Sequence, residues 1–205
     1  MNPSRFVYFD LGMVLVEFDH TIGIRQLAAV TGATETDAQR VVFESGLQNE
    51  YETGLVTSEQ FAAQINGELG SHATTSAIIE SLSAIFTLNE PILPVLESVR
   101  ASGLPMGILS NTCQGHWEWI AKQNLPVPGD WFEFAVLSYE AKSMKPDAGI
   151  YEVSESRCHC AGSNIFFTDD RKENIQAANA RGWSTHLYRH AGDLLHEFQS
   201  WLAAD

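Results

Sequence analysis

Four short polar segments follow apolar runs of the chain, and together they constrain the fold more than any other feature. The first contains an acid, the second a hydroxyl, the third a lysine and the fourth an acid pair. They are Phe9–Gly12, Leu109–Thr112, Met144–Asp147 and Phe167–Asp170. In an open α/β sheet, the ends of the parallel strands form the crevice where ligands bind. The four segments therefore predict a single site for a phosphate group and a divalent cation.

Strand-like and helix-like segments alternate along most of the chain. Short apolar runs predict strands over residues 6–9, 105–109, 132–137, 164–167 and 184–188. Helical patterns follow, over residues 92–101, 116–123, 148–156, 173–180 and 193–202. Strands that alternate with helices imply a parallel sheet with right-handed crossovers. The expected fold class is α/β, with a doubly wound, Rossmann-like parallel sheet.

Residues 17–86 interrupt this alternation with a helical pattern. Apolar clusters recur there at helical spacing, and glycines punctuate them. We expect a small helical cap over residues 17–86, inserted into a core made of residues 1–16 and 87–205. Polar groups on one cap helix could line the cleft toward a sugar, although ordinary exposed positions explain them equally well. These groups are Glu44, Gln48 and Tyr51.

The composition excludes several classes of partner. The net charge is −14 and the pI is near 4.8, whereas nucleic-acid binding and docking to anionic membranes both need a basic face. No apolar stretch approaches the length that crosses a bilayer. Three cysteines without a spaced framework, and no leader pattern in the first residues, favour a cytoplasmic protein. We expect a monomer or homodimer that acts on a small phosphate ester.

Asp10 is the candidate nucleophile, because a carboxylate can attack phosphorus and form an aspartyl-phosphate. The hydroxyl of Ser110 and the backbone N–H groups of Asn111 and Thr112 can bind phosphate oxygens. Lys145, which the following proline holds extended, would neutralise phosphate charge and keep the carboxylates ionised. A turn or helix cap would be the simpler explanation for any one of the polar residues alone. Their occurrence together favours a catalytic site.

Asp169 and Asp170 form the acid pair at the end of a predicted buried strand. Two adjacent carboxylates repel each other there, so a counter-charge is expected. Mg²⁺ is the natural candidate, since it is usually held by one or two carboxylates, waters and a substrate phosphate. Glu173, one turn further on, could bind a metal-bound water or could simply stabilise the first turn of its helix.

In type, order and spacing, the four segments resemble the motifs of the haloacid dehalogenase (HAD)-like hydrolase superfamily, whose members are mostly Mg²⁺-dependent phosphatases. The resemblance runs over nearly the whole chain. It implies a metal site made of Asp10, the Gly12 carbonyl and the acid pair, with Asp170 on the ion and Asp169 on Lys145. The catalytic residues that it implies are Asp10, Lys145 and Ser110, and the substrate-binding ones are Ser110, Asn111 and Lys145.

Within the superfamily, the chain is similar to a bacterial subgroup that includes α-D-glucose-1-phosphate phosphatases and lies near the phosphatase domain of soluble epoxide hydrolases. This similarity implies hydrolysis of a small phosphate monoester, of a sugar, through an aspartyl-phosphate at Asp10. It is carried by Phe9–Gly12, Ser110–Thr112 with His116 beyond it, Lys145–Asp147, Tyr51–Gly54 and Glu59–Phe61.

Gly12 departs from the superfamily pattern, because most of its phosphatases have a second aspartate there that protonates the leaving group. Such help is typically worth ~10²–10⁴-fold. Three interpretations stay open: a phosphatase for esters that depart easily, a 2-haloacid dehalogenase-type hydrolase, or a catalytically weakened protein that binds a phosphorylated ligand. The dehalogenases carry a tyrosine at this position and need no metal, so the intact acid pair favours a metal enzyme. Glu17, Asp19, His20 and His116 are the candidate substitute acids, although hinge or surface roles explain them more simply.

Overall fold

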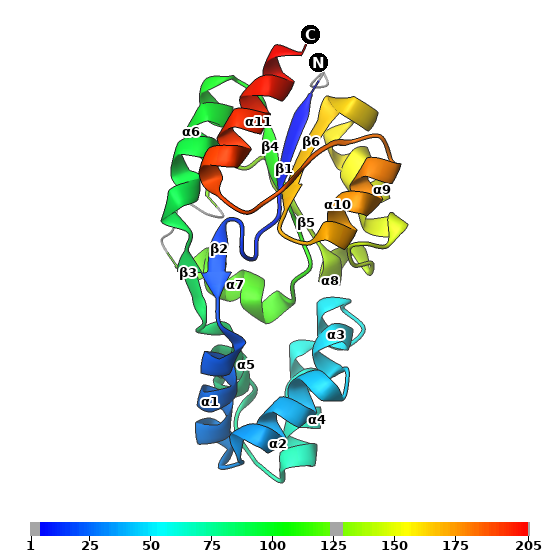
Figure 1. Ribbon diagram of the computed structural model, residues 1–205. Coiled ribbons are helices and arrows are strands. Elements are labelled where there is room, and N and C mark those ends of the chain that lie inside the picture. Colours follow the sequence, from blue (N-terminus) through cyan, green and yellow to red (C-terminus); the bar gives the residue numbers. More distant parts are fainter. Residues whose placement is uncertain (1–4, 124–128, 205) are drawn as a thin grey trace.

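Five parallel strands form the centre of the protein, whose computed structural model describes residues 5–123 and 129–204 (Figure 1). They pair in the order β5-β4-β1-β6-β7. Each strand begins and ends within two residues of the position predicted from an apolar run, and the doubly wound α/β class is confirmed. The strands are β1 (Phe6–Phe9), β4 (Met106–Ser110), β5 (Phe134–Leu137), β6 (Ile165–Asp169) and β7 (Ser184–Leu187).

Helices cover both faces of this sheet, and the side chains of β1 show why. Val7 and Phe9 pack on one face with residues of α6 and α11, whereas Phe6 and Tyr8 pack on the other with residues of α9 and α10. Successive side chains of a strand point to opposite faces, so a strand covered on both faces must be apolar throughout. These helices are α6 (Leu93–Ala101), α9 (Ala148–Cys158), α10 (Lys172–Ala180) and α11 (Ala191–Ala203).

Two further helices follow the carboxyl ends of β4 and β5, and short 3₁₀ turns complete this part of the chain. The helices are α7 (Gln114–Lys122) and α8 (Ser138–Ala141), and the turns are Glu90–Ile92 and Gly162–Asn164. The expectation that no leader precedes the first strand concerns residues 1–4, which lie outside the described residues.

Residues 19–85, called the helical segment below, lie beyond the carboxyl ends of the strands (Figure 1). Leu27, Val42 and Ile65 are buried in a core that the segment forms largely by itself. None of the helices in the described parts of the chain is long and apolar enough to cross a membrane. The division into a cap over 17–86 and a core of 1–16 and 87–205 stays a prediction. The helices are α1 (His20–Thr31), α2 (Glu35–Gln39), α3 (Leu47–Glu52), α4 (Ser58–Leu69) and α5 (Thr75–Ser83).

Two short strands that no sequence pattern predicts join the helical segment to the sheet. β2 (Val16–Phe18) pairs antiparallel with β3 (Phe86–Leu88). Three residues are too few to display the two-residue period that identifies a strand. Beside this pair, the Asn89 amide donates hydrogen bonds to the Val14 carbonyl at 2.7 Å and to the Tyr188 hydroxyl at 2.8 Å. Both ends of the helical segment are therefore attached to the core at one place.

Glu44, Gln48 and Tyr51, which we predicted to lie on one cap helix, belong to two separate helical segments. A π-helical turn over Arg40–Glu44 is followed by Gly46 with φ of 87°, and α3 begins at Leu47. This φ lies in the left-handed region that glycine adopts readily. Glycine thus ends the first segment, and the prediction of one continuous helix was wrong.

Candidate active site

One cavity of about 210 Å³ lies at the carboxyl ends of β1, β4 and β6. These strand ends carry three of the four polar segments on which the prediction rested, and the loop with Lys145 carries the other. Asp169 does not line the cavity and is fully buried. The six remaining predicted site residues line it: Asp10, Gly12, Ser110, Asn111, Lys145 and Asp170.

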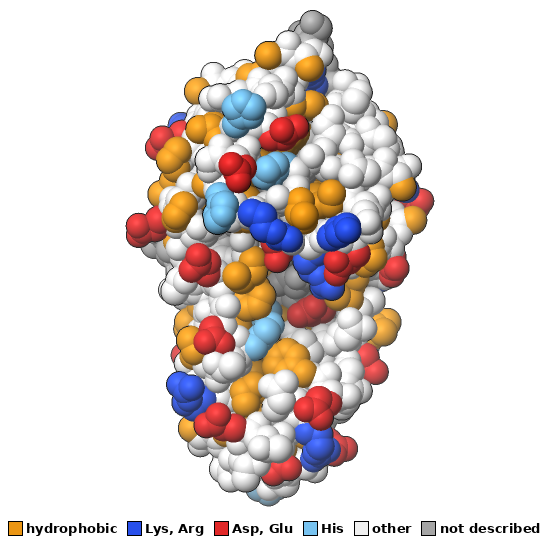
Figure 2. Space-filling model, viewed as in Figure 1, with side chains coloured by type: hydrophobic (Ala, Val, Ile, Leu, Met, Phe, Trp, Pro, Cys, Tyr) orange, Lys and Arg blue, Asp and Glu red, His pale blue; other side chains and the backbone are white. Residues whose placement is uncertain are grey.

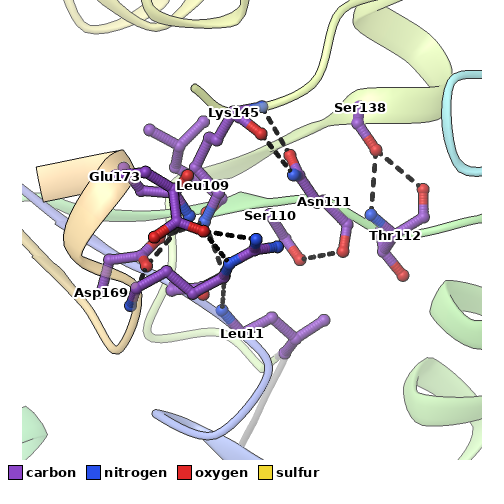
Figure 3. Close-up of polar contacts among 12 residues, drawn as sticks. Leu11, Leu109, Ser110, Asn111, Thr112, Ser138, Lys145, Asp169 and Glu173 are labelled. Carbon is purple, nitrogen blue, oxygen red and sulfur yellow. Dashed lines mark hydrogen bonds and ion pairs between the residues drawn. The ribbon is translucent and has the colours of Figure 1, made fainter. Parts of the chain in front are cut away.

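The Lys145 side chain forms ion pairs with two acidic side chains at the centre of the site (Figure 3). Its ammonium Nζ lies 2.8 Å from Asp10 Oδ1, 2.6 Å from Asp169 Oδ2 and 2.8 Å from the Leu109 carbonyl oxygen. Only 3% of the residue is exposed. A lysine ammonium has three donors, and each of the three has a partner here. The Lys145 ammonium therefore fixes the Asp10 carboxylate relative to the ends of β4 and β6.

Asn111 determines where the Lys145 backbone lies. Its amide nitrogen donates to the Lys145 carbonyl at 2.8 Å, and its amide oxygen accepts the Lys145 N–H at 2.7 Å. The peptide bond that follows, to Pro146, is cis. This pair of bonds commits the Asn111 side chain to positioning the lysine, so only its backbone N–H would be available to a phosphate.

The expectation that the Thr112 backbone N–H binds phosphate is wrong. That N–H donates to the Ser138 hydroxyl at 2.9 Å, and Ser138 is fully buried. Ser110 Oγ faces the cavity and donates a long bond of 3.3 Å to the Asn111 carbonyl. Thus the Ser110 hydroxyl and the Asn111 N–H remain as candidate phosphate donors.

Asn174 is a buried residue of the site that the sequence did not reveal. Its amide nitrogen lies 3.0 Å from both carboxylate oxygens of Asp169, and the Arg171 N–H donates to Asp169 Oδ1 at 2.8 Å. Together with Lys145, these donors hold Asp169 firmly. The spacing of Asn174 five residues beyond Asp169, one turn into α10, is the only signal that could have indicated it.

The three carboxylates of Asp10, Asp169 and Asp170 offer oxygens that all lie within 4.8 Å of one another. Burial raises the pKa of Asp10 to about 8, against the attraction of Lys145, and burial also raises the pKa of Asp170. Burial acts in the same sense on Asp169, but Lys145 outweighs it and the pKa of Asp169 lies below its usual value. Three carboxylates thus face one lysine, and a cation would stabilise the ionised state of Asp10.

Gly12 occurs where a larger side chain would not fit without movement. A Cβ built on Gly12 would lie 2.9 Å from Cε1 of Phe18, well inside the distance at which carbon atoms attract. Phe18, from β2, also lines the cavity. Its ring therefore occupies the space beside the backbone where the superfamily pattern has its second acid.

Aromatic and imidazole rings form one wall of the cavity. His20 lies between Phe18 and Phe43, with ring centroids 4.8 Å from each and the rings tilted or edge-on, and His116 packs edge-on against Phe86 at 5.1 Å. Both histidines line the cavity. Burial lowers the pKa of His20 and lowers that of His116 to about 4, so both imidazoles are neutral at pH 7.

The other predicted residues lie away from the cavity. Glu17 lines a separate depression, and Glu44, Gln48 and Tyr51 are not among the cavity-lining residues, which instead include Glu52. Glu173 forms an ion pair with Arg171 (Figure 3), so its carboxylate is engaged outside the acid cluster.

Basic side chains gather beside a hollow at the middle of one face of the molecule (Figure 2). Arg171 lines the cavity, and Arg189 donates to the Asp170 carbonyl at 2.9 Å. The molecule thus has local positive charge beside its cavity, against the net charge of −14.

Comparison with known proteins places this arrangement among related enzymes. No family model matches the chain. A D-ribitol-5-phosphate phosphatase of Bacteroides thetaiotaomicron is 23% identical over 194 residues, 91% of this chain and 93% of that protein. An HAD family enzyme of the same organism, crystallised with magnesium and inorganic phosphate, is 27% identical, with a TM-score of 0.80 over 95% of this chain and 98% of that one.

A predicted HAD-like family hydrolase of Porphyromonas gingivalis has the same fold, with a TM-score of 0.80 over 98% of each chain, at 20% identity. The agreement extends over the helical segment as well as the sheet, because almost the whole chain is covered in each comparison. The chain is therefore similar over nearly its whole length to HAD family enzymes, with acidic residues at the ends of β1 and β6 and a lysine in the loop after α8.

Proposed function

We propose that the protein is a Mg²⁺-dependent phosphatase that hydrolyses a small phosphate monoester, of a sugar or sugar alcohol, through an aspartyl-phosphate on Asp10. One observation carries the proposal: Asp10, Lys145 and Asp170 line one small cavity, Asp169 is buried against Lys145, and the three carboxylates outnumber the one lysine. The related D-ribitol-5-phosphate phosphatase and the neighbour's complex with magnesium and phosphate support it.

The residues present fit a magnesium ion. Mg²⁺ is bound through hard oxygen ligands and keeps several waters. Asp170 and Asp10 would hold it together with the Gly12 carbonyl, while Asp169 remains with Lys145 and Asn174. When bound, the ion would neutralise phosphate charge and polarise the phosphoryl group.

The chain's own groups would orient the reaction. The Leu11 N–H donates to Asp10 Oδ1 at 2.7 Å and Lys145 contacts the same oxygen, so Oδ2 is the oxygen for attack on phosphorus. The Ser110 hydroxyl and the Asn111 N–H would bind phosphate oxygens. The neutral aromatic wall suits an uncharged alcohol portion of the substrate, and the size of the cavity suits a small one.

The test is release of inorganic phosphate from sugar phosphates, sugar-alcohol phosphates, acyl phosphates and p-nitrophenyl phosphate, with Mg²⁺ and with EDTA. We expect release that requires the metal and that Asp10→Asn abolishes. Lys172→Met, which changes an exposed lysine of α10, is the control.

If no ester is hydrolysed by the folded protein, the phosphatase proposal is wrong. Chloride release from 2-chloropropionate would then support the dehalogenase-type alternative. Binding of phosphate without turnover would instead support the ligand-binding one.

A further inference from the structure

Glu52 is the acidic side chain that the helical segment contributes to the described lining of the cavity. It is the last residue of α3, and its backbone carbonyl contacts Ser138 of α8. The other lining acids, Asp10 and Asp170, belong to the proposed nucleophile and metal site. A carboxyl group of Glu52 is therefore available for a different role.

The Glu52 side chain is held in place by one hydrogen bond. The Gln48 amide nitrogen, one turn earlier on α3, donates to Glu52 Oε1 at 2.8 Å, and Gln48 is only 7% exposed. Among the described residues, Oε2 of Glu52 accepts no hydrogen bond. One oxygen is thus anchored, and the other is free to act on a ligand in the cavity.

The backbone around Glu52 is fastened to the core. Ser138 Oγ donates to the Glu52 carbonyl at 2.6 Å, Thr53 Oγ1 contacts Met144 Sδ at 3.0 Å, and Lys142 Nζ donates to the Gly54 carbonyl at 2.5 Å. The Ser138 hydroxyl is also hydrogen-bonded to the backbone N–H and carbonyl of Thr112, two residues after Ser110. These contacts keep Glu52 at the cavity as long as α3 stays docked on the core.

Burial favours the protonated form of Glu52 and disfavours the protonated form of the two histidines. Burial raises the pKa of Glu52, against the Gln48 hydrogen bond and the attraction of Arg171. The pKa values of His20 and His116 are lowered, so neither imidazole carries a proton to give at pH 7. The titratable and charged groups around Glu52 are Arg171, the Cys113 thiol, and the cavity residues Asp10, Lys145, Asp170, His20 and His116.

We propose that Glu52 is the general acid and base of the phosphatase and takes the role of the aspartate that Gly12 replaces. This inference rests on the proposed function. Asp10 Oδ2 forms a bond to phosphorus, the bond between phosphorus and the ester oxygen breaks, and Glu52 gives its proton to that oxygen as the alcohol leaves.

The Glu52 carboxylate then takes a proton from water, whose oxygen bonds to phosphorus. The bond between phosphorus and Asp10 breaks, and its electron pair returns to the Asp10 carboxylate. Inorganic phosphate leaves, and Glu52 is protonated again. One water is consumed, and one alcohol and one phosphate are formed.

A comparison of leaving groups tests this role. Glu52→Gln keeps an oxygen that can accept the Gln48 amide but cannot donate an acidic proton. With D-ribitol 5-phosphate or glycerol phosphate, whose alkoxides need protonation, we expect kcat to fall ~10²–10⁴-fold. With p-nitrophenyl phosphate, whose phenolate departs unprotonated, we expect a formation rate of the aspartyl-phosphate within about tenfold of wild type, measured as the burst of nitrophenolate.

Glu50→Gln is the matched control, because Glu50 is exposed on the same helix. It should leave both substrates unaffected. The alkaline fall of kcat for the alkyl ester should be present in the wild type and absent in Glu52→Gln, since an acid must be protonated to act.

An equal loss for both leaving groups, or no loss for either, would overturn the role of Glu52 while leaving the phosphatase intact. A wild-type protein that releases no phosphate even from p-nitrophenyl phosphate would instead overturn the proposed function, and the inference with it. Circular dichroism of Glu52→Gln separates a chemical effect from loss of folding, and Glu52→Asp, which retains the acid, should recover part of the alkyl-ester activity.

Discussion

The charge balance of the site depends on Lys145, the one lysine among three buried or half-buried carboxylates. Lys145→Met leaves Asp10 and Asp169 without their counter-charge. Removing one partner of a buried pair typically costs about 3–5 kcal/mol. We expect a loss of that size in the free energy of unfolding, measured by urea denaturation at pH 7, and the combined variant with Asp169→Asn should recover part of it.

The exposed Lys172→Met is the matched control and should change the free energy of unfolding by less than about 0.5 kcal/mol. A loss below about 1 kcal/mol for Lys145→Met would show that the two carboxylates find other compensation, contrary to the arrangement described above.

Gly12 and Phe18 form a second residue-level pair, because a Cβ on Gly12 would meet the Phe18 ring at 2.9 Å. Restoring the acid of the superfamily pattern by Gly12→Asp should therefore destabilise the protein by about 1–3 kcal/mol, as overpacking does. In the double variant with Phe18→Leu the combined loss should be smaller than the sum of the single losses. A thermodynamic cycle from urea denaturation measures this coupling, and strictly additive losses would contradict the steric argument.

The sequence identified Asp10, Lys145 and the acid pair because each lies in a motif that follows an apolar run, and the acids lie at strand ends. It could not identify Glu52 or Asn174, whose roles depend on tertiary contacts: α3 docks on α8, and α10 returns beside β6. From the sequence we also assigned the Thr112 N–H to phosphate. The sequence could not show that this N–H donates to Ser138, which lies 26 positions further along the chain. Local patterns thus revealed the reacting groups but not the residues that hold them.

At the scale of elements, the turn that follows α3 is packed tightly against α8. A Cβ on Gly54 would overlap the Tyr139 carbonyl oxygen, whereas one on Gly46, at the start of α3, would meet nothing within 4 Å. Both glycines have positive φ, of 71° and 87°. The two positions therefore differ in their surroundings more than in backbone strain.

Gly54→Ala should consequently separate α3 from the core, whereas Gly46→Ala should show only the cost of the left-handed conformation, about 1–2 kcal/mol. Hydrogen exchange of the α3 amides and kcat for an alkyl phosphate measure the difference. We expect faster exchange and a lower kcat for Gly54→Ala than for Gly46→Ala. Equal effects of the two substitutions would mean that the contact with Tyr139 does not hold α3 in place.

The same elements show how far the sequence predicts this fold. Buried strands and the helices after them follow from apolar runs, so the five-stranded sheet was predictable within two residues at each strand end. β2 and β3 were not, because three-residue strands lack a period. The break between the π-helical turn at Arg40–Glu44 and α3 was not predicted, because a glycine within a helical pattern does not by itself show that the backbone turns left-handed there.

At the scale of the whole molecule, the stability should depend on pH through His116. This residue is 6% exposed, and burial together with His20 lowers its pKa to about 4, against about 6.5 in an unfolded chain. The folded protein therefore binds this proton more weakly than the unfolded chain. The contribution of His116 to stability is complete above pH 6.5 and is lost as the pH falls toward 4.

Between pH 7 and pH 5, this single group should lower the free energy of unfolding by about 2 kcal/mol. Asp10, whose pKa is raised, acts in the opposite sense, because the folded protein binds its proton more strongly as the pH falls. Urea denaturation of wild type and His116→Gln at the two pH values separates the contribution of His116 from that of Asp10, because Asp10 is present in both proteins. The loss of stability on acidification should be smaller in His116→Gln by about 2 kcal/mol, with the exposed His72→Gln as control. An identical pH dependence in wild type and His116→Gln would mean that His116 binds its proton equally well in the folded and unfolded protein. The imidazole would then not be buried against the aromatic rings as described above.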